Sequence, residues 1–401
     1  MENIILFDDD YWQSLLPLTY TKPIAELRIG ILTISEKWKL RVNCSISYIT
    51  QDHLVDKYPI KISNNNLVVN SRLLPNDNIV NLILQLDINE ALLYQDNLIA
   101  ARLDAILFER LRNNEQVEDL NGVDISKHDK YLHLLSRPHD LFSENGKEIS
   151  KDFRLLTDNK ASQAIPDSCL SSTPENIFLA PGAEISHCII NASEGPVYIG
   201  ENAKVMEGTM IRGPFAMGAN SIIKMGARIY KDTSLGPYCK VGGELKNVNF
   251  QAYSNKAHEG YLGNSVIGEW CNLGADTNCS NLKNNYSEVK LWDYAKQSFV
   301  KTGLQFCGLI MGDHSKCGIN TMFNTGTVVG VACNLFGSGY PRNFIPSYTW
   351  GGSKGYKTYQ FDKALEVNEL VMARRKIKLT EQDRGILEYV FKNSAQFRNW
   401  E

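Results

Sequence analysis

The sequence lacks the features of a membrane or secreted protein. It has no run of about eighteen apolar residues, the length that a membrane-spanning helix requires. Its first residues do not combine a basic segment with a following apolar one, so no signal peptide is expected. The formal net charge of −3 gives no reason to expect nucleic acid as a partner. These absences predict a cytoplasmic protein without a membrane or nucleic-acid partner.

Paired metal-binding cysteines are also missing. The nine cysteines are scattered and none forms a C-x-x-C pair, which disfavours a zinc site built from thiolates. Several of them fall at positions of the repeat described next, where they would pack as small apolar side chains. Reduced thiols are the simplest interpretation, and they agree with a cytoplasmic location.

The most regular feature is an apolar residue at every sixth position in the middle of the chain. These residues are Ile199, Val205, Ile211, Met217, Ile223, Ile229, Leu235 and Val241. A period of six fits neither a helix nor a single strand, and it predicts a solenoid of short parallel strands with one inward side chain per hexad. Glycine often follows the inward residue, as at Gly200 and Gly218. We expect these glycines at corners of the coil, where a positive φ would favour glycine.

The phase of the repeat is lost and recovered twice. It returns at Ile267 and again at Met311, after gaps that exceed a multiple of six by two residues. We therefore expect one insertion within residues 243–266 and another within residues 274–310. Insertions in a solenoid form loops on one face, often the binding face, so the chemistry is expected in these segments.

The amino-terminal part alternates predicted strands with a predicted helix. Strands are expected at residues 3–7, 45–50, 67–70 and 92–101, and a helix at residues 23–38. This pattern predicts an α/β layer with a parallel sheet.

Ligands of parallel sheets bind at the carboxyl ends of the strands, which places Asp8, Asp9, Asp10 and Lys22 near any site. The carboxylates could hold Mg²⁺ for a nucleoside triphosphate, and Lys22 could meet a phosphate. The alternative is a polar loop that caps the next helix.

The chain divides into four expected segments. They are an α/β domain at residues 1–120, a helical arm and linker at 121–172, the solenoid at 173–340 and a helical tail at 341–401.

Two cations and one histidine are the first candidates for chemistry on the solenoid. Arg228 and Lys246 are eighteen residues apart, which is one coil, so we expect them to stack on the same outer face. Together they could clamp one phosphate, although two unrelated surface cations would give the same spacing. His258 is the candidate base, with Tyr261 three residues later, and a structural histidine is the alternative.

A resemblance to a known family covers the same region. The residues that carry it are His258-Glu259-Gly260-Tyr261-Leu262-Gly263, Ile267-Gly268, Cys271-Asn272-Leu273-Gly274-Ala275, Thr277 and Asn281. They resemble the acetyltransferase domain of the bacterial bifunctional N-acetylglucosamine-1-phosphate uridylyltransferase/glucosamine-1-phosphate N-acetyltransferase. That domain is a trimeric left-handed parallel β-helix. The resemblance therefore implies this fold, a homotrimer, and acetyl-CoA as co-substrate.

The resemblance also implies a role for each matching residue. His258 would be the general base, and Arg228 and Lys246 would bind the sugar phosphate. Asn272 and Asn281, with the nearby tyrosine, would position the sugar, and the backbone of Ala275 would lie near the acetyl-CoA thioester.

Two family residues that contact CoA are replaced in this sequence. A lysine contributed by a neighbouring subunit falls on Ser287, where Lys283 or Lys290 could take its place. A serine that contacts CoA falls near Ile319.

The amino-terminal part departs further from the family. The Gly-rich loop that holds UTP is absent, while Lys22-Pro23 could replace a family Lys-Pro. Other stretches are similar to a divergent bacterial branch described as sugar nucleotidyltransferase-like, which implies a Rossmann-like α/β domain. They are Leu6-Phe7-Asp8-Asp9, Leu16-Pro17-Leu18-Thr19, Arg28-Ile29-Gly30, Asn70-Ser71-Arg72-Leu73-Leu74-Pro75 and the stretch from Gly312 to Asn320.

The expected function is N-acetylation of glucosamine 1-phosphate, coupled to uridylyl transfer from UTP with Mg²⁺. The alternatives are transfer to another sugar phosphate, or a trimeric scaffold that binds sugar nucleotides without turnover.

Overall fold

The computed structural model describes residues 3–95, 97–113, 115, 120–126 and 132–400, which form two compact units. The first unit comprises Met1–Gln13, Lys22–Leu27 and Leu32–Ser136. The second comprises Ser14–Thr21, Arg28–Ile31 and Arg137–Glu401. No helix in the described part of the chain is long and apolar enough to cross a membrane.

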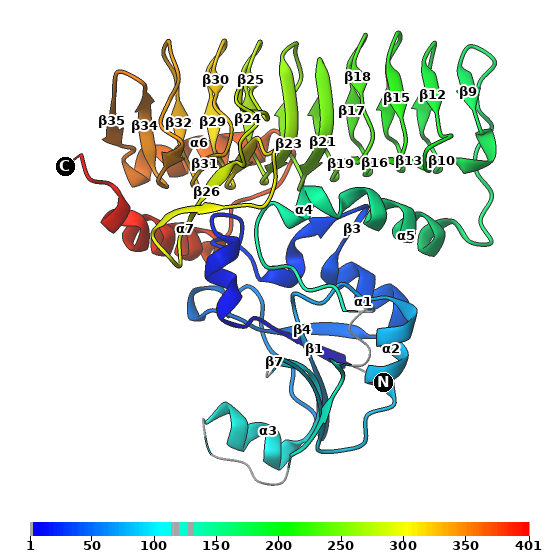
Figure 1. Ribbon diagram of the computed structural model, residues 1–401, viewed down its shortest axis with the longest axis vertical. Helices are drawn as coiled ribbons and strands as arrows, with labels where there is room; N and C mark the ends of the chain where they lie inside the picture. Colours follow the sequence, from blue (N-terminus) through cyan, green and yellow to red (C-terminus); the bar gives the residue numbers. More distant parts are fainter. Residues whose placement is uncertain (1–2, 96, 114, 116–119, 127–131, 401) are drawn as a thin grey trace. The chain divides into compact units, whose positions relative to one another are not determined.

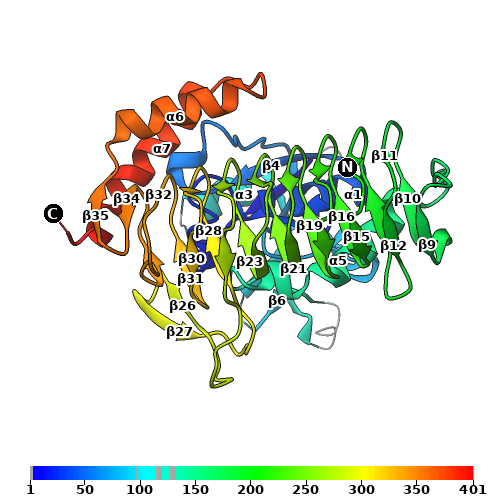
Figure 2. The ribbon, with the colours of Figure 1, turned by 90° about the horizontal axis from the view of Figure 1, so that it is seen from above.

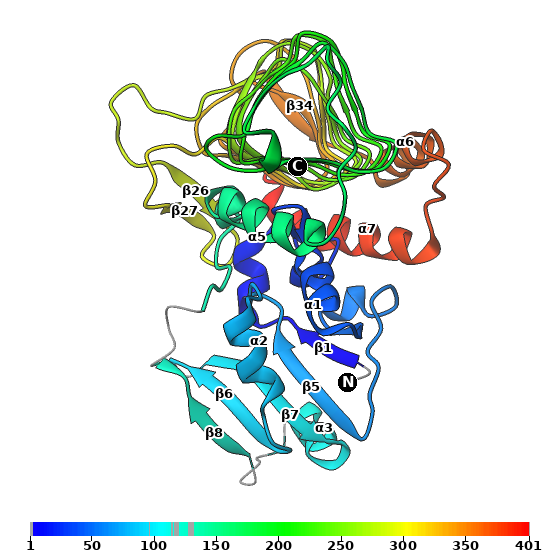
Figure 3. The same cartoon turned by 90° about the vertical axis from the view of Figure 1, so that its right-hand side faces the viewer.

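The first unit is built on a six-stranded sheet with the order β4-β1-β5-β7-β6-β8 (Figure 3). Its strands are β1 (Asn3–Phe7), β4 (Ser45–Ile49), β5 (Asn65–Asn70), β6 (Glu90–Tyr94), β7 (Asn97–Asp104) and β8 (Asn121–Asp124). Strand β1 is parallel to β4 and to β5, as predicted. Strand β7 is antiparallel to both neighbours, because the stretch predicted as one strand at residues 92–101 is a hairpin. The sheet is therefore mixed rather than wholly parallel.

The helix predicted at residues 23–38 is wrong in its first half. Helix α1 (Ile34–Val42) begins at a capping box, in which the Thr33 hydroxyl accepts from the backbone N–H of Glu36 and the Glu36 carboxylate accepts from the backbone N–H of Thr33. Upstream, Gly30 has φ +76, which a right-handed helix cannot accommodate. The other helices of this unit are α2 (Asp77–Leu84) and α3 (Ala105–Arg112), with short 3-10 turns at Ile24–Glu26 and Asp52–Leu54.

The second unit is a parallel β-solenoid, seen from the side in Figure 1 and end-on as a triangle in Figure 3. One wall is a ten-stranded sheet of β11 (Glu184–Ile185), β14 (Lys204–Val205), β17 (Ile222–Ile223), β20 (Lys240–Val241), β22 (Asn255–Lys256), β24 (Asn272–Leu273), β29 (Lys316–Cys317), β32 (Asn334–Leu335), β34 (Thr349–Gly352) and β35 (Gly355–Thr358). The eight predicted inward residues from Ile199 to Val241 are at most 3% exposed, which confirms the repeat.

A thirteen-stranded sheet forms further walls of the coil. Its strands are β9 (Leu170–Ser172), β10 (Ile177–Leu179), β12 (Ile189–Asn191), β13 (Val197–Ile199), β15 (Met210–Arg212), β16 (Phe215–Met217), β18 (Arg228–Ile229), β19 (Thr233–Leu235), β21 (Glu244–Phe250), β23 (Tyr261–Ile267), β28 (Leu309–Met311), β31 (Thr327–Val329) and β33 (Phe344–Ile345). Strands β25 (Asn278–Cys279) and β30 (Met322–Phe323) pair separately.

Helices α4 (Asp140–Ser143) and α5 (Asn145–Thr157) pack on the solenoid. The buried Asn145 side chain donates to the carbonyl of Asp232 at 2.8 Å and accepts from Ser234 at 3.0 Å and Asn249 at 3.1 Å. The chain ends with α6 (Phe361–Ala373) and α7 (Glu381–Asn393), which confirms the helical tail.

The first predicted insertion is wrong, because the chain between Val241 and Ile267 is shortened. The intervening inward residues are Leu245, Phe250, Lys256 and Leu262, which lie in register with residues of adjacent coils. The steps are thus four, five, six, six and five residues, so one additional side of the coil fits into the 26-residue gap.

The second predicted insertion is confirmed. A hairpin of β26 (Lys290–Asp293) and β27 (Ser298–Lys301) leaves the solenoid between β25 and β28 (Figure 2).

The glycines beside the inward residues serve close approach rather than unusual backbone angles. None of Gly200, Gly218 and Gly236 has a positive φ, which corrects the expectation from the sequence. A Cβ at Gly236 would instead lie 1.5 Å from the carbonyl oxygen of Gln251 on the next coil. The corner therefore leaves no room for a side chain.

The variant Gly236→Ala should lower the free energy of unfolding by about 1–3 kcal/mol or more, because backbone atoms of two coils must separate. Urea unfolding followed by circular dichroism measures the loss. The matched control is Gly385→Ala in α7, where a Cβ meets nothing within 4 Å and alanine favours the helix by up to about 1 kcal/mol. Equal stability of Gly236→Ala and the wild type would contradict the packing argument.

Candidate functional site

His258 lies at an exposed corner of the solenoid, in the loop between β22 and β23. Its imidazole makes no hydrogen bond to any residue that the structure describes. The same corner on an earlier coil carries another exposed histidine, His187, two residues after the inward Ile185. His258 occupies the equivalent place two residues after the inward Lys256. An exposed, unengaged imidazole is available to accept a proton from a bound substrate.

Arg228 reaches this corner from β18. Its Nη2 lies 3.2 Å from Glu259 Oε2, and its Nε lies 3.5 Å from Glu244 Oε2. The hydrogen bond with Glu259 is the main reason that the pKa of Arg228 is raised above its usual value. A phosphate at Arg228 would therefore have to replace or join two carboxylates.

The predicted stacking of Arg228 on Lys246 is wrong in register. Arg228 lies opposite Glu244, because the shortened coil brings a residue two positions earlier into line. Lys246 stands on the same strand two residues after Glu244, is exposed, and has its Nζ 5.9 Å from the ring centroid of Phe306. Residues two apart on a strand share a face, so both cations still lie on the outer face of the sheet.

The structure brings Tyr261 and Asn281 together. Asn281 Nδ2 donates to the hydroxyl of Tyr261 at 3.0 Å and to Asn264 Oδ1 at 2.7 Å. Burial raises the pKa of Tyr261 above its usual value, so the phenol stays protonated. These groups supply both donors and acceptors, which suits the hydroxyls of a sugar.

Ala275 lies on the next turn of the same corner as His258. The corner loops of the two turns are joined by a hydrogen bond from the N–H of Asp276 to the carbonyl of Glu259 at 3.0 Å. Asn272 is different, because its exposed position on β24 belongs to the ten-stranded wall, beside Asn255 in register. The structure thus groups His258 with Ala275, and leaves Asn272 on another wall from Tyr261.

A lysine that the sequence did not single out lies beneath His258. Lys256 fills an inward position, in register with Val241, and is 0% exposed. Its Nζ donates to the carbonyl of His258 at 2.8 Å and to that of Gly242 at 3.1 Å. Burial lowers the pKa of Lys256 to about 8. A regular six-residue spacing does not place Lys256 at an inward position. The shortened coil does, so the repeat in the sequence did not predict its burial.

Replacing Lys256 with Met should change how stability depends on pH. Between about pH 8 and pH 10 the unfolded chain keeps this lysine protonated while the folded chain does not, so the contribution of Lys256 to the free energy of unfolding rises with pH. Relative to Lys256→Met, the wild type should gain about 2 kcal/mol across this window. The raised pKa values of buried cysteines affect both proteins equally and cancel in the difference.

Urea unfolding of both proteins at several pH values measures this difference. The control is Lys204→Met, an exposed lysine of β14 on the same wall, whose difference from the wild type should stay constant over the window. A constant difference for Lys256→Met as well would show that Lys256 is charged in the folded state.

In the first unit, Asp8 follows β1 and contacts the turn that contains Lys22. Asp8 accepts from the N–H of Ile24 at 3.2 Å and from the Thr50 hydroxyl at 2.7 Å. Burial raises the pKa of Asp8 to about 7. The side chain of Lys22, two residues before Ile24, is buried. Asp8 and the Lys22 turn thus meet at the carboxyl end of the sheet, as predicted.

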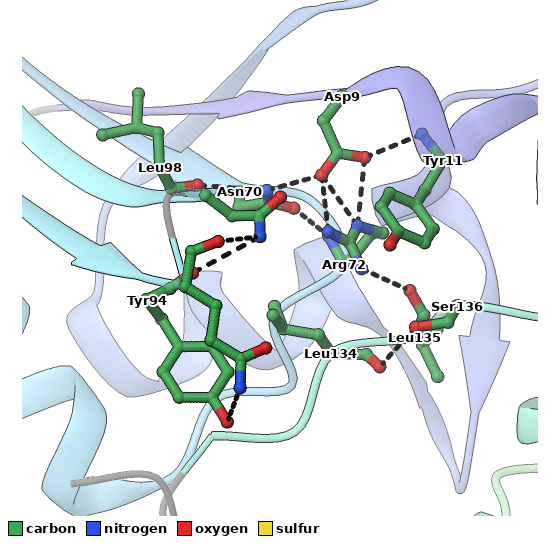
Figure 4. A network of polar contacts seen from close by, with 11 residues as sticks. Asp9, Tyr11, Asn70, Arg72, Tyr94, Leu98, Leu134, Leu135 and Ser136 are labelled. Atoms are coloured by element: carbon green, nitrogen blue, oxygen red, sulfur yellow. Dashed lines mark hydrogen bonds and ion pairs between the residues drawn. The ribbon is translucent and has the colours of Figure 1, made fainter. Parts of the chain in front are cut away.

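The next carboxylate, Asp9, is fully engaged in a polar network (Figure 4). Arg72 Nη2 lies 2.7 Å from Asp9 Oδ2 and its Nε lies 3.0 Å from Oδ1, while Asn70 Nδ2 donates to Oδ2 at 2.9 Å. The Arg72 guanidinium also covers the ring of Tyr11, 3.9 Å from its centroid. In the sequence, the partners of Asp9 appear as polar residues, Asn70 and Arg72, at the end of β5, which is the parallel neighbour of β1.

The predicted Mg²⁺ ligands do not form a metal cage. Both oxygens of Asp9 are occupied by Arg72, and Asp8 already accepts two hydrogen bonds. Among the residues that the structure describes, no group of three His, Cys, Asp or Glu side chains could hold a metal ion.

Comparison with known proteins covers both parts of the chain. Residues 4–161 match the family of sugar nucleotidyl transferases. A bifunctional sugar-1-phosphate nucleotidylyltransferase/acetyltransferase of Sulfurisphaera tokodaii is 32% identical over 36% of this chain and 36% of its own. The bifunctional protein GlmU of Methanocaldococcus jannaschii is 40% identical over 19% of this chain and 18% of its own. Over part of its length the chain is therefore similar to sugar nucleotidyl transferases and to GlmU-type bifunctional proteins.

The likeness to these GlmU-type relatives is partial. The chain spans about a third of the length of the Sulfurisphaera relative and less of the Methanocaldococcus one. A protein of Escherichia coli O6:K15:H31 named uncharacterized acetyltransferase YaiX is 27% identical over 45% of this chain and 76% of its own. Among solved structures, the UDP-N-acetylglucosamine acyltransferase from Campylobacter jejuni is similar over 56% of this chain and 95% of its own, at 13% identity. Its TM-score of 0.31 is too low to support any inference.

Proposed function

We propose that this GlmU-like chain acetylates the amino group of glucosamine 1-phosphate with acetyl-CoA and transfers a uridylyl group from UTP to the product. The observation that carries the proposal is the corner where the unengaged imidazole of His258 adjoins the loop of Ala275 on the next turn. The matched family of sugar nucleotidyl transferases and the relatives named as acetyltransferases support the two halves of the reaction.

In the acetyl transfer, His258 accepts the proton of the attacking amine. The amine nitrogen then bonds to the thioester carbonyl carbon, and the C–S bond breaks as CoA leaves as its thiol with the proton that His258 returns to the sulfur. The N–H of Ala275 donates no hydrogen bond to any described residue, so it is available to the oxyanion of the tetrahedral intermediate. Holding the amine against the thioester supplies much of the rate.

The sugar phosphate would bind between Arg228 and Lys246. Arg228 offers a planar set of donors and Lys246 a mobile charge. Glu259 and Glu244 pair with the guanidinium of Arg228 before the phosphate binds. These ion pairs fix the position of the guanidinium, but they also partly neutralise its positive charge. Tyr261 contributes a phenol for the sugar, and Asn281 an amide.

A row of exposed apolar side chains lies on the outer face of the thirteen-stranded sheet. Leu170, Ile189 and Met210 follow one another in register on β9, β12 and β15, and are 68%, 45% and 52% exposed. An unbroken row of exposed apolar side chains is typical of a surface that another chain covers. We therefore propose a homotrimer in which this row is buried.

The uridylyl transfer would use the carboxyl end of the sheet in the first unit. Asp8 and Lys22 would contact the nucleotide there, beside the ion pair of Asp9 and Arg72. Mg²⁺ would enter as its complex with UTP, because the residues that the structure describes form no metal cage of their own.

The variant His258→Ala should lower the turnover of glucosamine 1-phosphate and acetyl-CoA by about two orders of magnitude or more, because the amine loses its base. Release of free thiol measures the acetyl transfer, and release of pyrophosphate after addition of UTP and Mg²⁺ measures the second step. His187→Ala is the matched control, since it removes an exposed histidine from the same corner of an earlier coil. Full turnover in His258→Ala would sink the proposed mechanism.

Replacing either Arg228 or Lys246 with Gln should raise the KM for glucosamine 1-phosphate by about tenfold or more, because a charged hydrogen bond to the phosphate is lost. The KM for acetyl-CoA should change little. Initial rates with each substrate varied in turn give both constants. The control is Arg212→Gln, which removes an exposed arginine from β15, one coil earlier, and should change neither constant. If both constants rise equally, the cations support the fold rather than the phosphate.

A further inference from the structure

The second unit contains a cavity of about 840 Å³ that lies away from the His258 corner. It is lined by residues of the hairpin β26–β27, of β33 and β35 and of the carboxyl terminus. The hairpin and β35 lie toward one end of the solenoid (Figure 2). His258 and the residues proposed to bind the sugar phosphate and the thioester do not line the cavity, whereas Lys283 and Lys290, which could replace a family lysine, do. A cavity of this size can enclose a ligand as large as a nucleotide.

The charged side chains that line this cavity are all cations among the residues that the structure describes. Its cations are Lys283, Lys290 and Arg342, and no carboxylate lines it among the described residues. Lys283 Nζ donates to a neutral partner, the carbonyl of Glu288, at 2.9 Å. The Lys290 and Arg342 side chains make no ion pair with any described residue. Unpaired cations around one space attract an anion.

The acidic side chains of the hairpin are engaged elsewhere. The Glu288 carboxylate accepts from the N–H of Gly303 and lies 3.5 Å from Lys301 Nζ. The buried Asp293 carboxylate pairs with Arg137 at 2.7 Å. Neither carboxylate lines the cavity, so neither neutralises its cations from within.

Aromatic side chains supply the rest of the wall. Trp292 and Phe344 are stacked with centroids 4.2 Å apart and planes 11° apart. The indole Nε1 atoms of Trp292 and Trp400 are buried and have no hydrogen-bond partner among the described residues. On the same cavity, the Arg342 guanidinium lies 5.8 Å from the ring centroid of Tyr356.

We propose that this cavity binds a nucleoside diphosphate or triphosphate, separately from both transfer reactions. The phosphates would meet Lys283, Lys290 and Arg342, and the base would pack against the aromatic wall. A ligand with phosphate alone would leave the aromatic wall unused, and an uncharged aromatic ligand would leave the cations unpaired. The inference does not depend on the chemistry proposed for His258.

Binding of ADP and of UDP to the full-length chain, without sugar phosphate or acetyl-CoA, tests this inference by isothermal titration calorimetry. Arg342→Gln and Lys290→Gln should each weaken the site by about tenfold or more. Lys301→Gln is the matched control, because it pairs in register with Lys290 on the same hairpin but does not line the cavity. It should bind as the wild type does, and thermal melting of each variant checks that it is folded.

Three further arms decide which site and which chemistry is measured. Asp8→Asn should leave the cavity's binding intact, and loss of all nucleotide binding in that variant would place the ligand in the first unit and overturn the proposal. Inorganic pyrophosphate should bind at least about tenfold more weakly than ADP, because it lacks the ring that the aromatic wall would stack. Equal binding of the two, or no binding of either nucleotide at millimolar concentration, would also overturn it.

Discussion

The close approach of successive coils is the constraint on which the second unit depends. Each coil of the solenoid hydrogen-bonds to the next through short parallel strands, so two backbones run about 5 Å apart over the whole length. At the corners this spacing leaves no space for a Cβ, as the contact between Gly236 and Gln251 illustrates. The same stacking decides which side chain points inward and which outward, and therefore where every candidate site residue stands.

Shortening of the coils after Val241 sets the character of the candidate site. It moves Glu244 opposite Arg228 and moves Lys256 into the interior. The first change gives Arg228 a carboxylate partner in addition to Glu259. The second places an amino group under the loop of His258, where it bonds the carbonyl of that residue. The site thus combines an exposed imidazole with a backbone that is held from inside the fold.

Much of this architecture was readable in the sequence, and the failures have physical causes. The six-residue period predicted the solenoid, because burial on one inward position repeats with the coil. It could not predict the register at Arg228, since a gap of 26 residues fits an insertion as well as a set of short sides. The prediction of a helix at residues 23–38 was wrong because it relied on apolar spacing. The capping box at Thr33 and the glycine at position 30 indicate a later start.

The polar network of the first unit was beyond reach for another reason. Asp9 and Arg72 are 63 residues apart, and only the pairing of β1 with β5 brings them together. Both strands were predicted, but their sequences do not show that β1 and β5 are neighbours in the sheet. Grouping of Tyr261 with Asn281, in contrast, followed from the resemblance, and the hydrogen bond between them supports it.

The solenoid also behaves as a chain of links whose strength varies along its length. Because each coil touches only its neighbours, the stability of the whole is close to a sum over adjacent pairs. The coil that contains Lys256 substitutes a buried amine for an apolar side chain, so the links on either side of it gain less from burial. A local opening at this coil would divide the solenoid into two blocks that meet at the candidate active corner.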